Sequence, residues 1–238
     1  MKKISLVLST IFALSGLMQL HAQTAEEIIA KHIEAVGGKE KLASLKSMKI
    51  ENKMEIMGGE SPSSTTILVG KGFKTEAEFN GQKMVSVVTD KGGWSINPMG
   101  GSGSPEPMPE DQVKLAQDQI YWHPLFDFAS RGGKVALAGK EKAGTVDAYK
   151  IVLTNEAGAT NYFIDPTTYM LLQMSKTANM MGQDMEVTTS YSDFRKTDYG
   201  VMMPYVTEMN FGGQFSMTSK VQKVEINQPI DETIFQMK

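Results

Sequence analysis

The segment SMKIENKMEI, residues 47–56, decides the fold of this chain because its hydrophobicity alternates with a period of two residues. Successive side chains of a β-strand point to opposite faces of the sheet, so this pattern predicts a strand with one apolar and one charged face. Lysines and glutamates occupy every second position, and the apolar positions between them include Met48, Ile50, Met54 and Ile56. Strands of this kind are typical of antiparallel sheets, which can face water on one side.

The same alternation recurs along the chain between turn signals such as Asn80-Gly81 and Asp165-Pro166. We count roughly ten to twelve such segments, with too few helices between them for repeated βαβ crossovers. The sequence therefore predicts a mainly β (α+β) fold, built on an antiparallel sheet. Apolar positions of these further strands include Phe73, Phe79, Met203, Tyr205, Met209 and Phe211.

A helix is predicted at residues 25–36, because Thr24 and Glu27 form a capping-box pair and Gly37-Gly38 follows the apolar stripe. A short helical stretch at 40–45 follows. Residues 110–122 form another predicted helix, with a further one after Pro124, and the Gly-, Ser- and Pro-rich stretch 98–109 before them is predicted to be a flexible surface loop.

Residues 1–22 have the composition of a secretory signal peptide, with Lys2 and Lys3 ahead of an apolar run. A membrane anchor is the weaker interpretation, because serines, a threonine and a glycine interrupt that run. We expect the mature N-terminus near Gln23 and a single domain over residues 23–238. The protein is therefore expected in the periplasm, without a lipid-bearing cysteine.

Composition excludes several classes of function. The chain has no cysteine, which excludes disulfides, thiol catalysis and thiolate metal sites. Its net charge of −3 gives no basic excess to attract phosphates, which argues against a nucleic-acid partner. Outside the signal segment only His32 and His123 remain, without the spacing of metal ligands, and we find no nucleophile elbow or phosphate-binding loop. No cofactor, metal or catalytic residue is expected.

Methionine is unusually frequent, with 18 residues in the chain. Thioether side chains are flexible and polarizable, so they fill irregular cores and also line surfaces that accept ligands of variable shape. Three interpretations stay open: ordinary core packing, a cavity for acyl chains, and a soft-metal site. The last would use the group Met174, Met180, Met181 and Met185, which surrounds a turn.

Four segments of the chain resemble the LolA-like outer-membrane lipoprotein-sorting proteins and their LolB and RseB relatives. They are AEEIIAKHIEAVGGKEKLASLKSMKI (25–50), YFIDPTTYMLLQM (162–174), YSDFRKTDYGVMMPY (191–205) and NQPIDETIF (227–235). The resemblance implies a curved, incomplete antiparallel barrel with an N-terminal helix and central lid helices on its concave face. It also implies shelter for acyl chains in that concavity. The sorting carriers latch the lid with an arginine on an early strand, where this chain has Lys74.

The expected function is that of a periplasmic, non-enzymatic carrier for lipid, lipoprotein acyl chains or another amphiphile. The alternative is an RseB-like regulatory module that senses lipid, which allows an envelope membrane protein as partner; an enzyme ranks third. We expect a monomer. The predicted ligand-binding residues comprise strand positions and an aromatic-rich lid: Met48, Ile50, Met54, Ile56, Phe73, Phe79, Met84, Trp94, Trp122, Leu125, Phe126, Phe128, Met203, Tyr205, Met209 and Phe211.

Overall fold

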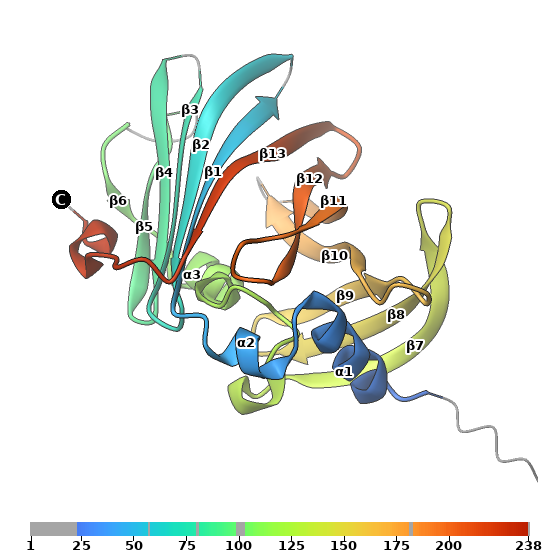
Figure 1. The fold of residues 1–238 in the computed structure, drawn as a ribbon. Helices are drawn as coiled ribbons and strands as arrows, with labels where there is room; N and C mark the ends of the chain where they lie inside the picture. Colours follow the sequence, from blue (N-terminus) through green and yellow to red (C-terminus); the bar gives the residue numbers. More distant parts are fainter. Residues whose placement is uncertain (1–22, 57, 80, 99–102, 181–182, 238) are drawn as a thin grey trace, which may run out of the picture.

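The computed structural model describes residues 23–56, 58–79, 81–98, 103–180 and 183–237. These residues form one antiparallel 13-stranded sheet in the order β6-β5-β4-β3-β2-β1-β13-β12-β11-β10-β9-β8-β7 (Figure 1). The sheet curves strongly, but β6 and β7 are unpaired edges, so the barrel is incomplete, as predicted. The strands are β1 Ser47–Ile56, β2 Gly59–Leu68, β3 Gly72–Phe79, β4 Gln82–Thr89, β5 Gly92–Ile96, β6 Glu106–Pro107, β7 Lys134–Ala143, β8 Val146–Asn155, β9 Gly158–Ile164, β10 Leu171–Met180, β11 Gln183–Lys196, β12 Met202–Phe211 and β13 Phe215–Ile226.

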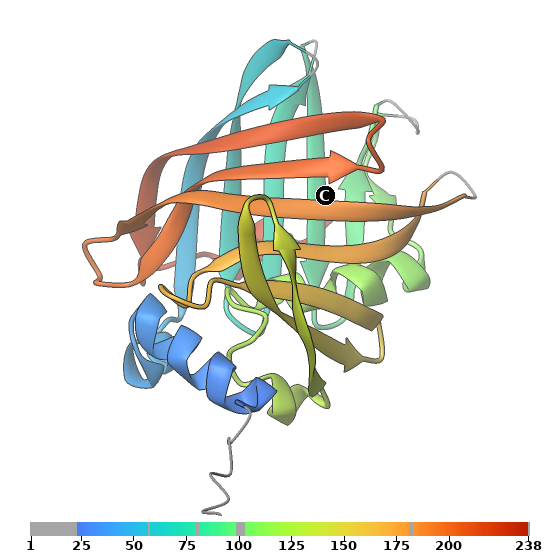
Figure 2. The same ribbon diagram turned by 90° about the vertical axis from the view of Figure 1, so that its right-hand side faces the viewer.

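The two halves of the sheet face each other across the interior. Strands β10 to β13 cross in front of β1 to β5 when the molecule is seen from the side, and α1 lies below them (Figure 2). Ile226 of β13 and Ile151 of β8 contribute to the same hydrophobic cluster, although four strands separate β13 from β8. The face that carries both side chains is therefore the inside of the curve, and we call it the concave face.

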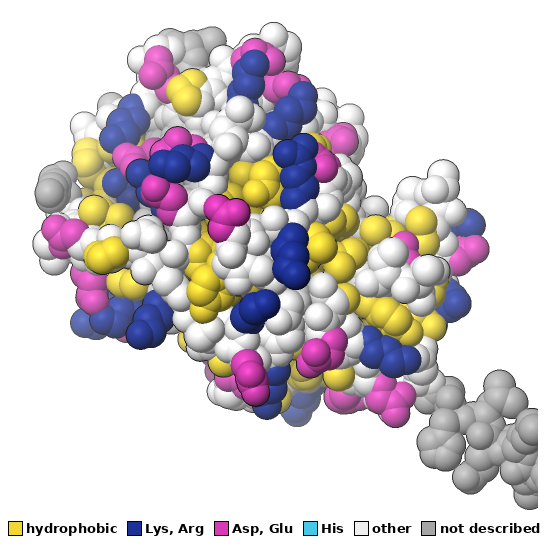
Figure 3. Space-filling model, in the orientation of Figure 1, with side chains coloured by type: hydrophobic (Ala, Val, Ile, Leu, Met, Phe, Trp, Pro, Cys, Tyr) yellow, Lys and Arg dark blue, Asp and Glu magenta, His cyan; other side chains and the backbone are white. Residues whose placement is uncertain are grey.

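The side chains of β1 lie alternately on the two faces of the sheet, as the alternating hydrophobicity of its sequence predicted. Met48 pairs with Ile67 of β2 and with Ile226 of β13, which places all three on the concave face. The intervening lysines and glutamates point to the convex face, where Lys220 Nζ lies 2.6 Å from a carboxylate oxygen of Glu55. Charged side chains are prominent on the surface turned to the viewer in Figure 3.

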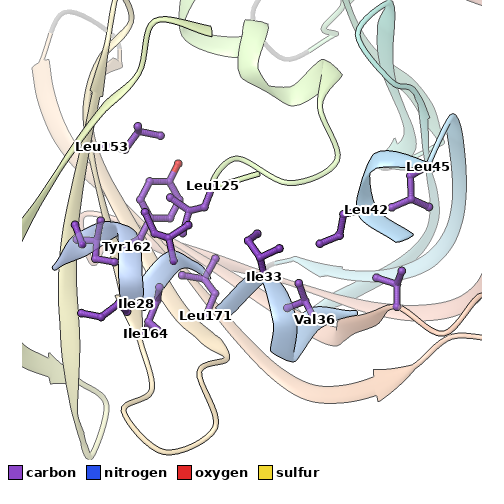
Figure 4. Packing of buried hydrophobic residues seen from close by; sticks show 14 residues of the cluster. Ile28, Ile33, Val36, Leu42, Leu45, Leu125, Leu153, Tyr162, Ile164 and Leu171 are labelled. Carbon is purple, nitrogen blue, oxygen red and sulfur yellow. The ribbon is translucent and has the colours of Figure 1, made fainter. Parts of the chain in front are cut away.

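The first helix, α1 (Ala25–Val36), begins and ends where the sequence predicted. The amide of Glu27 donates to Thr24 Oγ1 and the amide of Thr24 donates to the Glu27 carboxylate, both at 3.2 Å, so two otherwise unpaired amides are satisfied. Gly37 ends the helix with φ 139°, which a side chain would disfavour. The buried stripe of α1 packs into the main core of the protein (Figure 4), together with Leu125, Ile151, Leu153, Tyr162, Ile164 and Leu171.

The remaining helices are shorter than predicted. The helix α2 covers Lys39–Ala43, and α3 covers Glu110–Ala116 before it tightens into the 3₁₀ turn η1 (Gln117–Ile120). After Pro124 only the 3₁₀ turn η2 (Phe128–Arg131) forms, because Asp127 and Gly132 adopt left-handed backbone conformations on either side of it. Residues 99–102 of the predicted loop lie outside the described residues, and the loop's remainder contains β6.

The C-terminal segment covers the convex side of β4 and β5. Its last 3₁₀ turn, η3 (Glu232–Phe235), lies beside these strands in Figure 1. Phe235 packs on Val85 and Val87, and its carbonyl accepts a 2.8 Å hydrogen bond from Trp94 Nε1. Among the described residues, no helix has the length and apolar character needed to cross a bilayer.

Candidate ligand-binding site

A row of residues that are direct partners on neighbouring strands crosses the concave side of the sheet from β1 to β9. The strand registers align Ile56 with Met217, Met217 with Met209, and Met209 with Thr189. The row then continues through Met174 to Tyr162. Apart from Thr189 and the Tyr162 hydroxyl, these side chains are apolar, and three of them are methionines. This row is thus a mainly apolar strip on the concave face that extends over five strands beyond β1.

Many predicted ligand-binding residues lie on this face. Met48 is buried at its base, with 3% of its surface exposed, whereas most of the others keep part of their surface accessible. The structure therefore divides the methionines between core packing and an open apolar face. The predicted residues that share the concave face, by register from Met48 or Met209, are Ile50, Met54, Ile56, Phe73, Met84 and Phe211.

Other predicted residues lie on the opposite face or beyond the row that Met209 belongs to. Trp94 pairs with Val87 and points to the convex face, so it does not lie with the concave set. Tyr205 lies near the start of β12, four residues before Met209, so alternation places it at the far end of the concave face, with its ring centroid 4.7 Å from the Arg195 guanidinium. Met203 is buried nearby, and the side chain of Phe79 lies outside the described residues.

The aromatic-rich segment anchors in the main core instead of spanning the open part of the concave face. Leu125 is 1% exposed and belongs to the cluster that α1 covers. Its neighbours Trp122, Phe126 and Phe128 pack against the same cluster. This segment therefore joins the lid to the core.

The lid over the concave face consists of α3 and η1. On one side it is held by apolar contacts, since Val113 and Ile120 are buried in a cluster with Val88 and Phe73 of the sheet. The amide of Gly70 also donates a 3.0 Å hydrogen bond to the carbonyl of Ile120. This side of the lid is firmly attached to β2 to β4.

On its other side the described residues of the lid are held by polar contacts. Asn155 Nδ2, at the end of β8, donates to Asp118 Oδ2 at 2.6 Å, and Lys176 Nζ of β10 lies 3.5 Å from the Leu115 carbonyl oxygen. Lys74 does not contact this edge of the lid, because its register places it on the convex face, where its Nζ lies 3.2 Å from the Glu76 carboxylate. In the described structure this lid edge is therefore attached through Asn155 and Lys176, and not through Lys74.

A buried pair of histidines lies where the lid segment meets α1. His32 and His123 are 1% and 8% exposed, and their Nε2 atoms are 2.9 Å apart. Burial lowers the pKa of His32 to about 4 and lowers the pKa of His123 well below its usual value. Sequence spacing did not reveal this pair. Within the described residues, no group of three His, Asp or Glu side chains could hold a metal, and Met180 and Met181 of the soft-metal interpretation fall outside what is described of side chains.

The geometry defines an open antiparallel half-barrel with an apolar concave face and a short helical lid. Solved structures with this architecture include a LolA-superfamily protein from Nitrosomonas europaea, with a TM-score of 0.59 and 13% identity, covering 90% of this chain and 98% of that one. A putative outer membrane lipoprotein-sorting protein domain from Vibrio parahaemolyticus aligns with a TM-score of 0.58 and 12% identity, over 88% and 94% of the two chains.

A DUF1329 family protein from Desulfovibrio piger also aligns with a TM-score of 0.58 and 12% identity, over 90% of this chain and 98% of that one. The chain therefore has a LolA-like fold. No protein-family model and no curated protein sequence matches it. At these identities the likeness shows the fold alone.

Proposed function

We propose that the protein is a non-enzymatic carrier or binding protein for lipid or another amphiphile, which it holds on the concave face of its sheet. The observation that carries this proposal is the row Ile56–Met217–Met209–Thr189–Met174. It presents partly exposed thioether and aliphatic groups across several strands beneath a lid. A contiguous apolar surface in a concavity is suited to a hydrocarbon chain, and methionines adapt to chains of different shape. The LolA-like fold supports the same proposal.

We further propose that the protein is exported and works in the periplasm, with lipid or lipoprotein acyl chains as its ligand. This rests on residues 1–22, whose charged start and apolar run are those of a signal peptide. N-terminal sequencing of the protein from the cell envelope is expected to begin at or near Gln23. A protein that still begins at Met1 would exclude cleavage.

Native mass spectrometry of the protein purified from its own envelope tests the carrier proposal. We expect a co-purified acyl-containing ligand that dissociates on activation in the gas phase. The matched control is a Met209→Lys variant prepared in the same way, because a cation in the middle of the apolar row should oppose entry of a hydrocarbon chain. Equal ligand occupancy in both proteins, or none in the unmodified one, would contradict binding at this face.

A further inference from the structure

Lys176 places a positive charge on the apolar concave face. It stands opposite Val187 in the β10–β11 register and two residues from Met174, so all three share that face. The neighbouring residues of the face on β9, β11 and β12 are uncharged: Tyr162, Val187, Thr189, Met209 and Phe211. Lys176 is half-buried there, and a lysine that loses contact with water is normally paired.

The ammonium group of Lys176 has little to pair with in the described structure. Within the part of the chain that the structure describes, its one hydrogen bond is to the Leu115 carbonyl oxygen, at the long distance of 3.5 Å. Among the described residues no carboxylate forms an ion pair with it, and Asp118 acts on it only at longer range. Burial accordingly lowers the pKa of Lys176. An ammonium has three N–H donors, so most of its hydrogen-bonding capacity is open to a ligand.

Thr189 supplies a second unpaired polar group next to Lys176. The two residues are diagonal neighbours on β10 and β11, a separation of roughly 7 Å that a long side chain can bridge. Thr189 is 4% exposed, and its Oγ1 has no hydrogen-bond partner among the described residues. Buried hydroxyl groups are normally satisfied, so an acceptor that reaches Thr189 once the covering side chains move would complete its hydrogen bonding.

We propose that Lys176 and Thr189 bind the carboxylate of a long-chain fatty acid, whose hydrocarbon lies along Met174, Met209 and Met217. This inference rests on the proposed function and specifies its ligand. One ammonium and one hydroxyl donor match the single charge and the two oxygens of a carboxylate. The adjoining methionine row is uncharged and partly exposed, which suits a single apolar chain.

The test compares ligands that differ only in the head group. The dissociation constants of hexadecanoate, its methyl ester and hexadecyl phosphate are measured by displacement of a fluorescent fatty acid at pH 8, below micelle formation. We expect hexadecanoate to bind about tenfold or more tightly than the ester, because a hydrogen bond between two charged groups at a half-buried site is strong. An equal affinity for the ester, or a preference for hexadecyl phosphate, would overturn the proposal.

Three variants assign the preference to these residues. Lys176→Met should abolish the preference for hexadecanoate over its methyl ester. Lys176→Arg should retain most of this preference, and Thr189→Val should reduce it severalfold. Lys74→Met is the matched control, since this lysine lies on the convex face and should leave the ratio unchanged. If Lys176→Met weakens the acid and the ester equally, the lysine only holds the lid and the proposal fails.

Separate measurements test whether each variant folds and whether the carrier proposal holds. Each variant is checked by circular dichroism, and if Lys176→Met does not fold, the ratios for Lys176→Arg and Thr189→Val against Lys74→Met decide. Failure of all three compounds to bind the unmodified protein overturns the fatty-acid proposal. Native mass spectrometry then decides whether another amphiphile occupies the face, which keeps the two failures distinguishable.

Discussion

His32 and His123 meet in the interior with their Nε2 atoms 2.9 Å apart, and one hydrogen bond fixes which nitrogen carries each proton. His32 Nδ1 lies 2.6 Å from the carbonyl oxygen of Tyr169, which only accepts, so Nδ1 is the protonated nitrogen of His32. His32 Nε2 then accepts from His123 Nε2–H. The remaining nitrogen, His123 Nδ1, is a buried acceptor without a partner among the described residues. Burial lowers the pKa of both histidines, so both rings are neutral in the folded protein near pH 7 and this assignment of protons holds.

This pair should make the protein less stable in mild acid. The folded-state pKa of His32, about 4, lies below the value of roughly 6.5 expected when unfolded, so the unfolded chain takes up protons first as the pH falls through 6.5. Its stabilising contribution is present above pH 6.5 and is lost between that pH and about 4. We expect His32 alone to lower the unfolding free energy by about 2 kcal/mol between pH 7.5 and 5, with His123 adding in the same direction.

Urea unfolding at the two pH values measures this loss, and the double variant His32→Phe, His123→Phe is the control. The variant has no group that titrates at this position, so its unfolding free energy should change much less over the same range. An equally steep loss in the double variant would assign the pH dependence to other groups.

The sequence predicted those parts of the fold that depend on near neighbours. The cap at Thr24, the end at Gly37 and the two faces of β1 each follow from patterns within a few residues. The histidine pair joins residues 91 positions apart, which no local pattern records. The face on which the Trp94 side chain lies is another feature that the local sequence pattern does not decide. Alternation shows that its strand has two faces, but only the packing of the C-terminal segment decides which one it occupies.

The methionines should divide into core and surface positions when a lysine is introduced. Met48→Lys would bury an unpaired charge at a site that is 3% exposed, so we expect a loss of roughly 3–5 kcal/mol in unfolding free energy. Met209→Lys lies on the partly exposed row, where the ammonium can reach water, and should cost about 1 kcal/mol. Chemical unfolding and uptake of a fluorescent acyl probe are measured together. Uptake should fall in the folded Met209→Lys protein, and if both variants unfold, the row is core.

The C-terminal turn should stabilise the sheet from its convex side. Phe235→Ala removes a buried ring from Val85 and Val87, so we expect a loss of about 3 kcal/mol. Gly72→Ala should also destabilise, because its Cβ would lie 2.8 Å from the Phe235 ring. In a Trp122→Phe background, Phe235→Ala should shift the Trp94 emission to longer wavelength, while a ligand on the concave face should leave Trp94 unchanged. A ligand-induced shift of Trp94 would argue against the concave site.

The lid should open at its polar edge and pivot on its apolar one. Asn155→Ala removes the 2.6 Å hydrogen bond to Asp118, so we expect faster uptake of an acyl probe with little change in the unfolding free energy. Val113→Ala instead weakens the buried contact with Val88 and should lower stability by about 1 kcal/mol.

Because the chain has no cysteine, Leu115→Cys gives a single labelling position on the lid, and Met237→Cys gives an exposed control near the C-terminus. An environment-sensitive dye should respond to ligand at position 115 and not at 237. Uptake rates that are unaffected by Asn155→Ala, together with a silent dye at position 115, would mean that the lid stays closed while ligand enters elsewhere.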